Sequence, residues 1–286
     1  MKIRDAFRLT MAAGLLILPL AALRAQTGAT APADPYLAPL ARIFDVQDKI
    51  RDIHPAFERL HPVAIVAGGE FLIYVPDLSK RRYKLVTKAP DTFAIPVGIR
   101  AAMPLDFWGG RMACVVTPEV FDKTAGYATV FHEFVHCHQW DAGELRLKDS
   151  LGVYKKAMEK KDYMWELQYP FPYENPDFVR DYKALLTALG QGDSGRALEI
   201  RKALKARLSR EEWEYMTWQE WKEGAARFLE NEIDARLGLP LNASGLNPPF
   251  TRVAFYAGGE ALIRMLEKGD PGLVKDLEAL YRKIAE

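Results

Sequence analysis

The spacing of the hydrophobic positions changes near residue 118. Before that point, short apolar runs are separated by Gly, Pro and Asp, as in β-strands joined by turns; the runs cover residues 63–66, 71–75, 83–86, 92–97 and 111–117. Ala67-Gly68-Gly69-Glu70 separates the first two runs and predicts a hairpin. After residue 118, apolar residues recur at helical spacing. The pattern predicts an α+β fold, with a small mixed β-sheet in residues 62–117 and a helical half in residues 120–286.

The N-terminus has the pattern of an export signal. Basic residues come first, and an apolar run at residues 11–23 follows them; the basic residues are Lys2, Arg4 and Arg8. This run is too short to span a bilayer comfortably, and small residues lead to a cleavage point after Ala25. We therefore expect residues 1–25 to be a signal peptide of bacterial type, with an uncleaved anchor as the alternative.

The remainder of the chain predicts a short linker and one domain. Residues 26–39 are rich in Ala, Pro and Thr and are expected to form a flexible leader. Residues 40–286 would form a single domain in the periplasm or outside the cell, with no membrane span after signal cleavage. The formal net charge is +1, which gives no electrostatic basis for binding nucleic acid. No pattern predicts an oligomeric state.

His132-Glu133-Phe134-Val135-His136 is an H-E-x-x-H motif within a predicted helix. Positions i and i+4 lie on one helix face, so both imidazoles can bind one Zn²⁺ ion. Glu133 can then act as general base toward a water without being a ligand. From Thr129 to Cys137 the only charged residue besides the histidines is Glu133. A helix of this composition is expected to be buried beside a metal rather than exposed to solvent.

The two cysteines, Cys114 and Cys137, lie in the last predicted strand and in the motif helix. An oxidising compartment would permit a disulfide between them, and two small buried thiols are the alternative.

Two histidines and a water leave zinc one protein ligand short. Glu223 is the first candidate, because Gly224 follows it in mid-helix, where glycine costs about 1 kcal/mol relative to alanine. Such a glycine implies close packing, which could be against the motif helix. Glu230 and Glu220 are alternative ligands. Glu230 could instead orient a zinc-bound histidine from behind.

These motifs resemble the gluzincin metallopeptidases, in particular the catalytic domain of the aminopeptidase N family. That family follows H-E-x-x-H with a helix containing N-E-G-x-A, and Glu223-Gly224-Ala225-Ala226 matches the E-G-x-A part. It then carries a catalytic tyrosine in a Y-x-x-G stretch, which Tyr256-Ala257-Gly258-Gly259 matches. The resemblance implies that Glu223 is the third zinc ligand. It also implies that Tyr256 donates a hydrogen bond to the oxyanion of the tetrahedral intermediate.

The chain departs from the family in two ways. A segment covering residues 141–207 separates the two metal-binding motifs, where the family has a much shorter connection. The G-x-M-E-N strand, whose glutamate holds the free amine of the substrate, has its nearest counterpart in Gly110-Arg111-Met112-Ala113-Cys114, with Ala113 in place of the glutamate. This strand could still bind an extended peptide along its edge. Aminopeptidase specificity is therefore not expected from this site.

The resemblance implies a zincin-like metalloprotease fold with the active site between the β-rich and helical halves. The expected function is that of an exported zinc metallopeptidase, with one Zn²⁺ per chain and a peptide or protein as substrate. The alternative is a catalytically silent zincin-fold protein that binds peptides or serves as a scaffold in the cell envelope.

Overall fold

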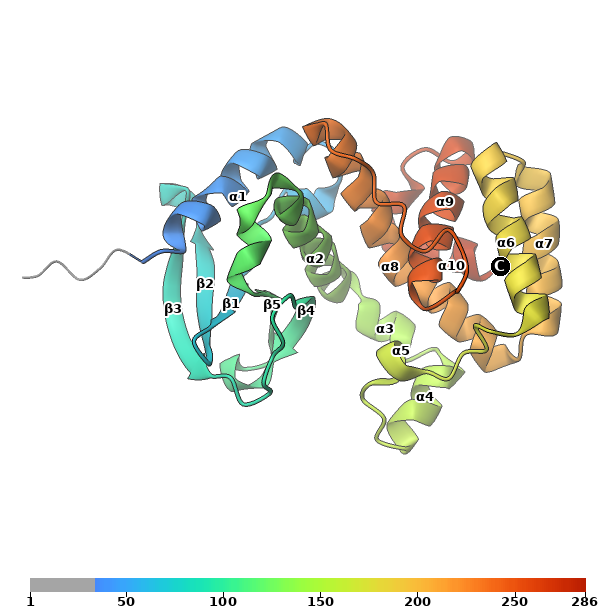
Figure 1. Ribbon diagram of the computed structural model, residues 1–286, viewed down its shortest axis with the longest axis horizontal. Helices are drawn as coiled ribbons and strands as arrows, with labels where there is room; N and C mark the ends of the chain where they lie inside the picture. Colours follow the sequence, from blue (N-terminus) through green and yellow to red (C-terminus); the bar gives the residue numbers. More distant parts are fainter. Residues whose placement is uncertain (1–33) are drawn as a thin grey trace, which may run out of the picture. The chain divides into compact units, whose positions relative to one another are not determined.

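The computed structural model describes residues 34–286 (Figure 1). The predicted signal peptide and most of the predicted leader lie outside these residues. Helix α1 (Leu37–Ile50) begins within the last three residues of the predicted leader, where the ring of Tyr36 contacts that of Tyr74. The folded domain therefore begins slightly earlier than the apolar pattern predicts.

The strands of residues 34–286 form one five-stranded sheet in the order β3-β2-β1-β5-β4; their bounds are β1 (Val63–Ala67), β2 (Glu70–Asp77), β3 (Arg82–Pro90), β4 (Arg100–Leu105) and β5 (Arg111–Val116). β1 and β2 form the predicted antiparallel hairpin, with Ala67 opposite Glu70. β1 pairs with β5 in parallel, and the other neighbours are antiparallel. The sheet is mixed, as the sequence predicts.

Residues 92–97 are a loop, so the strand predicted there is wrong. The Asp91 carboxylate accepts hydrogen bonds from the backbone N–H groups of Phe93 and Ile95, which bends the chain. The strand comes later, as β4 at the edge of the sheet. Pro104 lies within β4, and a proline in an apolar run argues against a strand when only the sequence is read. An edge strand can contain proline, because one side of it needs no hydrogen-bond donor.

The helices of the described residues follow the sheet, apart from α1; they are α2 (Thr124–Ala142), α3 (Glu144–Lys148), α4 (Gly152–Glu159), α5 (Trp165–Gln168), α6 (Pro176–Gln191), α7 (Ser194–Arg207), α8 (Arg210–Leu237), α9 (Val253–Gly269) and α10 (Leu277–Ala285), with short 3₁₀ turns at η1 (Pro55–Phe57), η2 (Leu78–Lys80), η3 (Asp106–Trp108), η4 (Pro118–Asp122) and η5 (Leu273–Lys275). The α+β class, with a small sheet followed by a mostly helical half, is thereby confirmed. No helix of the described residues has the length and apolar character needed to cross a membrane.

Helix α2 lies between the sheet and helix α8 (Figure 1). Its apolar residues and the inner face of the sheet share one continuous core, to which Ile65, Cys114 and Phe131 belong. This burial on two sides explains the composition of the helix, which has an apolar residue at almost every position around His132 and His136.

Helix α8 begins with a capping box, in which Ser209 and Glu212 bond each other's backbone N–H groups. Its mid-helix Gly224 packs closely, but against α9 rather than against the motif helix. A β-carbon on Gly224 would lie 2.5 Å from the Cα of Gly259, and one on Gly259 would lie 2.2 Å from the carbonyl oxygen of Glu220. The two glycines let the α8 and α9 backbones touch.

Candidate metal centre

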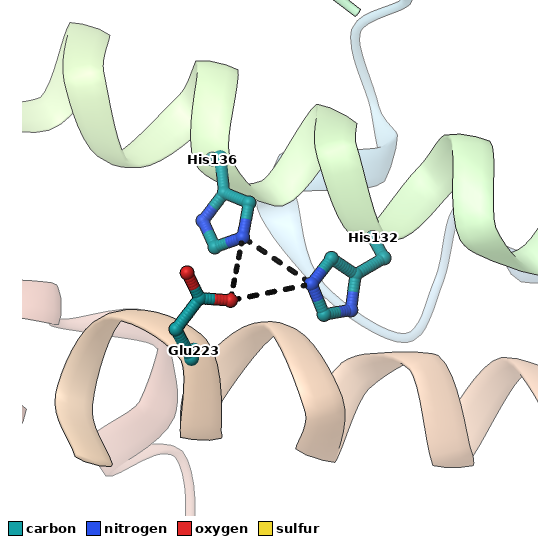
Figure 2. A group of neighbouring side chains, drawn as sticks. All are labelled: His132, His136 and Glu223. Atoms are coloured by element: carbon teal, nitrogen blue, oxygen red, sulfur yellow. Dashed lines mark hydrogen bonds and ion pairs between the residues drawn. The ribbon is translucent and has the colours of Figure 1, made fainter. Parts of the chain in front are cut away.

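Three buried side chains converge from two helices: His132 and His136 from α2 and Glu223 from α8 (Figure 2). The two Nε2 atoms are 3.3 Å apart. Glu223 Oε2 lies 3.7 Å from Nε2 of His132 and 3.4 Å from Nε2 of His136. The four-residue spacing places both rings on one face of α2, as the motif predicts.

These distances can be tested against the geometry of zinc. Ligand atoms at about 2.0–2.1 Å from a tetrahedral ion are separated from one another by roughly 3.3–3.4 Å. The separations between the two imidazole nitrogens and the carboxylate oxygen, 3.3, 3.4 and 3.7 Å, are close to three edges of such a tetrahedron. The donor set fits a catalytic zinc site, which takes three protein ligands and leaves a fourth position open.

The outer nitrogen of His132 is held by Glu230. Nδ1 of His132 lies 2.9 Å from Glu230 Oε2, and the Glu230 side chain is 10% exposed. Arg227 contacts the same carboxylate oxygen at 3.3 Å, and Asn242 donates to the other one. A carboxylate in this position fixes the tautomer and the direction of a ligand imidazole. Glu230 is thus placed to orient His132, and its oxygens do not join the triad.

The second ring is held by a residue that the sequence analysis did not select. Nδ1 of His136 lies 2.8 Å from Gln139 Oε1, and Gln139 donates to the backbone carbonyl of Lys222. Gln139 therefore orients His136 and joins α2 to α8 beside Glu223. Its position three residues after His136 on the same helix was the available signal.

Glu223 uses its two oxygens differently. Oε2 faces the imidazoles, while Oε1 accepts a hydrogen bond of 3.1 Å from Nη1 of Arg252. The nearby histidines and Arg252 outweigh the effect of burial and hold the pKa of Glu223 well below its usual range. The carboxylate is therefore ionised, as a metal ligand must be.

His132 shows the complementary effect. Burial alone would lower its pKa, but the carboxylates of Glu223 and Glu230 outweigh that penalty and raise the pKa to about 10. Without a metal, a proton on His132 would supply the positive charge between these two carboxylates. A metal ion bound by Nε2 would have to displace that proton.

Glu133, the expected general base, is buried beside His132 and is 6% exposed. Among residues 34–286, no donor is hydrogen-bonded to its carboxylate, so its oxygens can accept a hydrogen bond from a water. Cys114 is close enough for Glu133 to raise the pKa of its thiol further, beyond the effect of burial.

Cys114 and Cys137 are both buried free thiols in this structure. Burial raises the pKa of each thiol, so neither is poised as a thiolate ligand. The disulfide that an oxidising compartment would permit is not formed here, and it stays a prediction.

Tyr256 comes from the first turn of α9 and lies beside the triad. The guanidinium carbon of Arg252 is 5.2 Å from the centre of its ring, and that of Arg227 is 5.5 Å away. Burial and the Glu223 carboxylate raise the pKa of Tyr256. Its hydroxyl therefore keeps its proton at neutral pH and can serve as a hydrogen-bond donor.

Glu220 does not face the histidines. Its carboxylate, wholly buried, bonds Tyr182 at 3.0 Å and Arg201 at 2.8 Å. The structure therefore brings His132, His136 and Glu223 together and separates Glu220 from them.

Behind Glu223, four charged residues form a closed set of alternating ion pairs. Lys148 and Lys222 each contact both Glu144 and Glu166, at distances of 2.7–2.9 Å. The two lysines outweigh the effect of burial and lower the pKa of Glu166 to about 2. This set joins α3, α5 and α8 immediately beside the candidate metal ligand.

The strand expected to bind peptide is not at an edge. The Gly110–Cys114 stretch leads into β5, which is paired with β1 on one side and β4 on the other. Its backbone groups are therefore committed within the sheet, and the edge strand on this side of the sheet is β4.

No family model, curated protein or solved structure matches this chain.

Proposed function

We propose that this protein is a zinc-dependent peptidase of the gluzincin type. The observation that carries the proposal is the tetrahedral spacing of the three donor atoms of His132, His136 and Glu223. Both imidazoles also have a partner on their outer nitrogen, which is how metal-binding histidines are held in place. A chance pair of histidines on a helix would have no need of either feature.

The same arrangement supports a zincin-like fold. The motif helix α2 packs on the mixed sheet, and α8, which carries Glu223, packs on α2 from the helical half (Figure 1). A site between these two halves is what the resemblance to gluzincins implies.

A zinc ion held by His132, His136 and Glu223 would supply a Lewis acid that polarises a peptide carbonyl and acidifies a water. Glu133, to which no donor among residues 34–286 is hydrogen-bonded, would take the proton of that water and then deliver it to the leaving amine. Tyr256 keeps its proton and donates a hydrogen bond to the carbonyl oxygen as negative charge develops there.

The site has no anchor for a free amino group at Ala113, which lies in an inner strand and is wholly buried. The proposed activity is therefore not that of an aminopeptidase of the usual kind. Export to the periplasm or beyond remains part of the proposal on the pattern of residues 1–25 alone.

Glu133→Gln tests the hydrolytic mechanism against the silent alternative. The amide keeps the shape of the side chain but cannot accept the proton, so hydrolysis of a casein or mixed-peptide substrate should fall by at least 10²-fold. Zinc content, measured on the same preparation, should stay near that of the wild type. A wild type that holds zinc but cleaves nothing above the rate of this variant would support the silent binding protein.

A further inference from the structure

Arg252 differs from the other polar groups of the site in its exposure and in its hydrogen bonding. It lies at the N-terminal end of α9, with 25% of its side chain exposed, compared with 12% for Glu223 and 7–9% for the two histidines. The residue combines a fixed positive charge with access to solvent at the triad.

Most of the donors of Arg252 are not used by the protein. Nη1 donates to Glu223 Oε1 at 3.1 Å and to Gln219 Oε1 at 3.4 Å. Within residues 34–286, Nε and Nη2 have no hydrogen-bond partner. A guanidinium that served only to neutralise Glu223 would be expected to pair with it through two parallel N–H groups. This one contacts the carboxylate through a single nitrogen.

The position of the guanidinium suits a group on the substrate. Arg252 contacts Oε1 of Glu223, whose other oxygen, Oε2, faces both histidines. Only the Glu223 carboxylate therefore lies between Arg252 and the proposed metal position. Successive Cα atoms of a peptide are about 3.8 Å apart. A carboxylate on the residue following the cleaved bond would therefore come within reach of Arg252.

The electrostatics favour an anion there. Arg252 lies over the ring of Tyr256, as does Arg227, whose charge is paired with Glu230, and the N-terminus of α9 adds a partial positive charge beside Arg252. Ala113 offers no carboxylate to bind an amine.

We propose that Arg252 is the specificity residue of this site and binds a carboxylate on the substrate, next to the bond to be cleaved. The proposal rests on the proposed peptidase function. The carboxylate is either the C-terminal α-carboxylate of a peptide or an acidic side chain, and the two sources are separated by the choice of probe.

The first experiment measures binding, and so does not depend on turnover. The probes are a dipeptide hydroxamate with a free C-terminal carboxylate, its C-terminal amide, and two amides that differ only in Asp or Asn at the last position. Each is titrated by calorimetry into the zinc-loaded wild type and into zinc-loaded Arg252→Gln, Arg252→Lys and Arg264→Gln. Arg264 is the matched control, because it is also on α9 and pairs with Glu260 and Glu232.

An anionic probe should bind the wild type and Arg264→Gln at least tenfold more tightly than its neutral twin. This affinity ratio between the anionic probe and its neutral counterpart should fall below about twofold in Arg252→Gln and be partly kept in Arg252→Lys. A gap between the free acid and its amide identifies the C-terminus as the source, and a gap between Asp and Asn identifies a side chain.

Equal binding of each charged probe and its neutral twin to the wild type, or a gap that survives in Arg252→Gln, would overturn the assignment. If the wild type also hydrolyses peptides, the proposed function stands and only the role of Arg252 is lost. If zinc-loaded wild type binds no hydroxamate and cleaves no peptide, both fall together.

Discussion

The contact between Gly224 and Gly259 allows a quantitative prediction, because it joins the helix of the third candidate ligand to the helix of Tyr256. A β-carbon on residue 224 would lie 2.5 Å from the Cα of Gly259 and 2.8 Å from its carbonyl carbon. Carbon atoms in contact are normally about 3.5–4.0 Å apart. Gly224→Ala must therefore push α8 and α9 apart by about 1 Å, since both partners are backbone and cannot swing away.

Overpacking of this kind costs up to about 3 kcal/mol. Alanine recovers about 1 kcal/mol through its better helix propensity, which leaves a net loss of about 2 kcal/mol. For a domain of this size the midpoint of thermal unfolding should fall by roughly 4–8 °C. Tyr256 lies three residues before Gly259, so a shift of about 1 Å should also lower kcat on the order of 10²-fold. Zinc content should be kept, because the contacts between α2 and α8 are not altered.

The assay compares thermal unfolding, zinc content and peptide hydrolysis for Gly224→Ala and for Gly190→Ala. Gly190 is the matched control: it lies on α6, is exposed, and has no atom within 4 Å of the position of an added β-carbon. The control should be as stable as the wild type or more stable by up to about 1 kcal/mol. If Gly224→Ala behaves like the control in all three measurements, the close helix contact and its role in placing Tyr256 are refuted.

Four further outcomes follow from the site and the ion pairs beside it. Tyr256→Phe should lower kcat by about 10²–10³-fold with zinc retained, as measured by steady-state kinetics, and an unchanged kcat would remove the oxyanion role. The raised pKa of His132, about 10, means that zinc binding at pH 7 should release a proton, detected by calorimetry in buffers of different ionisation enthalpy. Because the pKa of His132 is higher in the folded metal-free protein than in the unfolded chain, its protonation contributes fully to the free energy of unfolding below about pH 6.5. This contribution should be lost as pH rises toward about 10, and urea unfolding that shows no such decline would contradict the prediction. Glu166→Gln should lower the free energy of unfolding by about 3 kcal/mol at pH 7, as measured by urea unfolding. This difference from wild type should shrink as pH falls from about 4.5 toward 2, because protonation of Glu166 in the folded protein then removes its ion pairs with the two lysines.

The local pattern around the motif could be predicted from the sequence because helical spacing determines it. His132 and His136 share a face of α2 whatever the rest of the fold does. Glu223 could be selected because Gly224, which follows it, destabilises a helix interior and so indicates a close packing contact nearby. That contact was assigned to the wrong helix, since sequence spacing does not reveal which backbone packs against a glycine.

The partners that orient the site were harder to predict because they come from side chains distant in the sequence. Asn242 contacts Glu230 from a loop, and Arg252 reaches Glu223 from the start of another helix. Gln139 was within reach of prediction, because it lies one turn from His136, but a glutamine on a helix carries no distinctive signal. The edge strand β4 was missed because its proline and small residues give no alternating pattern.

The most direct test of the account is the zinc content of purified protein, by elemental analysis, for wild type, Glu223→Ala and Glu230→Ala. We expect about one zinc per wild-type chain, a loss of stoichiometric zinc in Glu223→Ala, and retention in Glu230→Ala with an affinity about 10–100-fold weaker in competition with a chelator. A wild type that takes up no zinc even after reconstitution, or a Glu223→Ala variant that holds zinc as tightly as the wild type, would contradict the assignment of the metal centre.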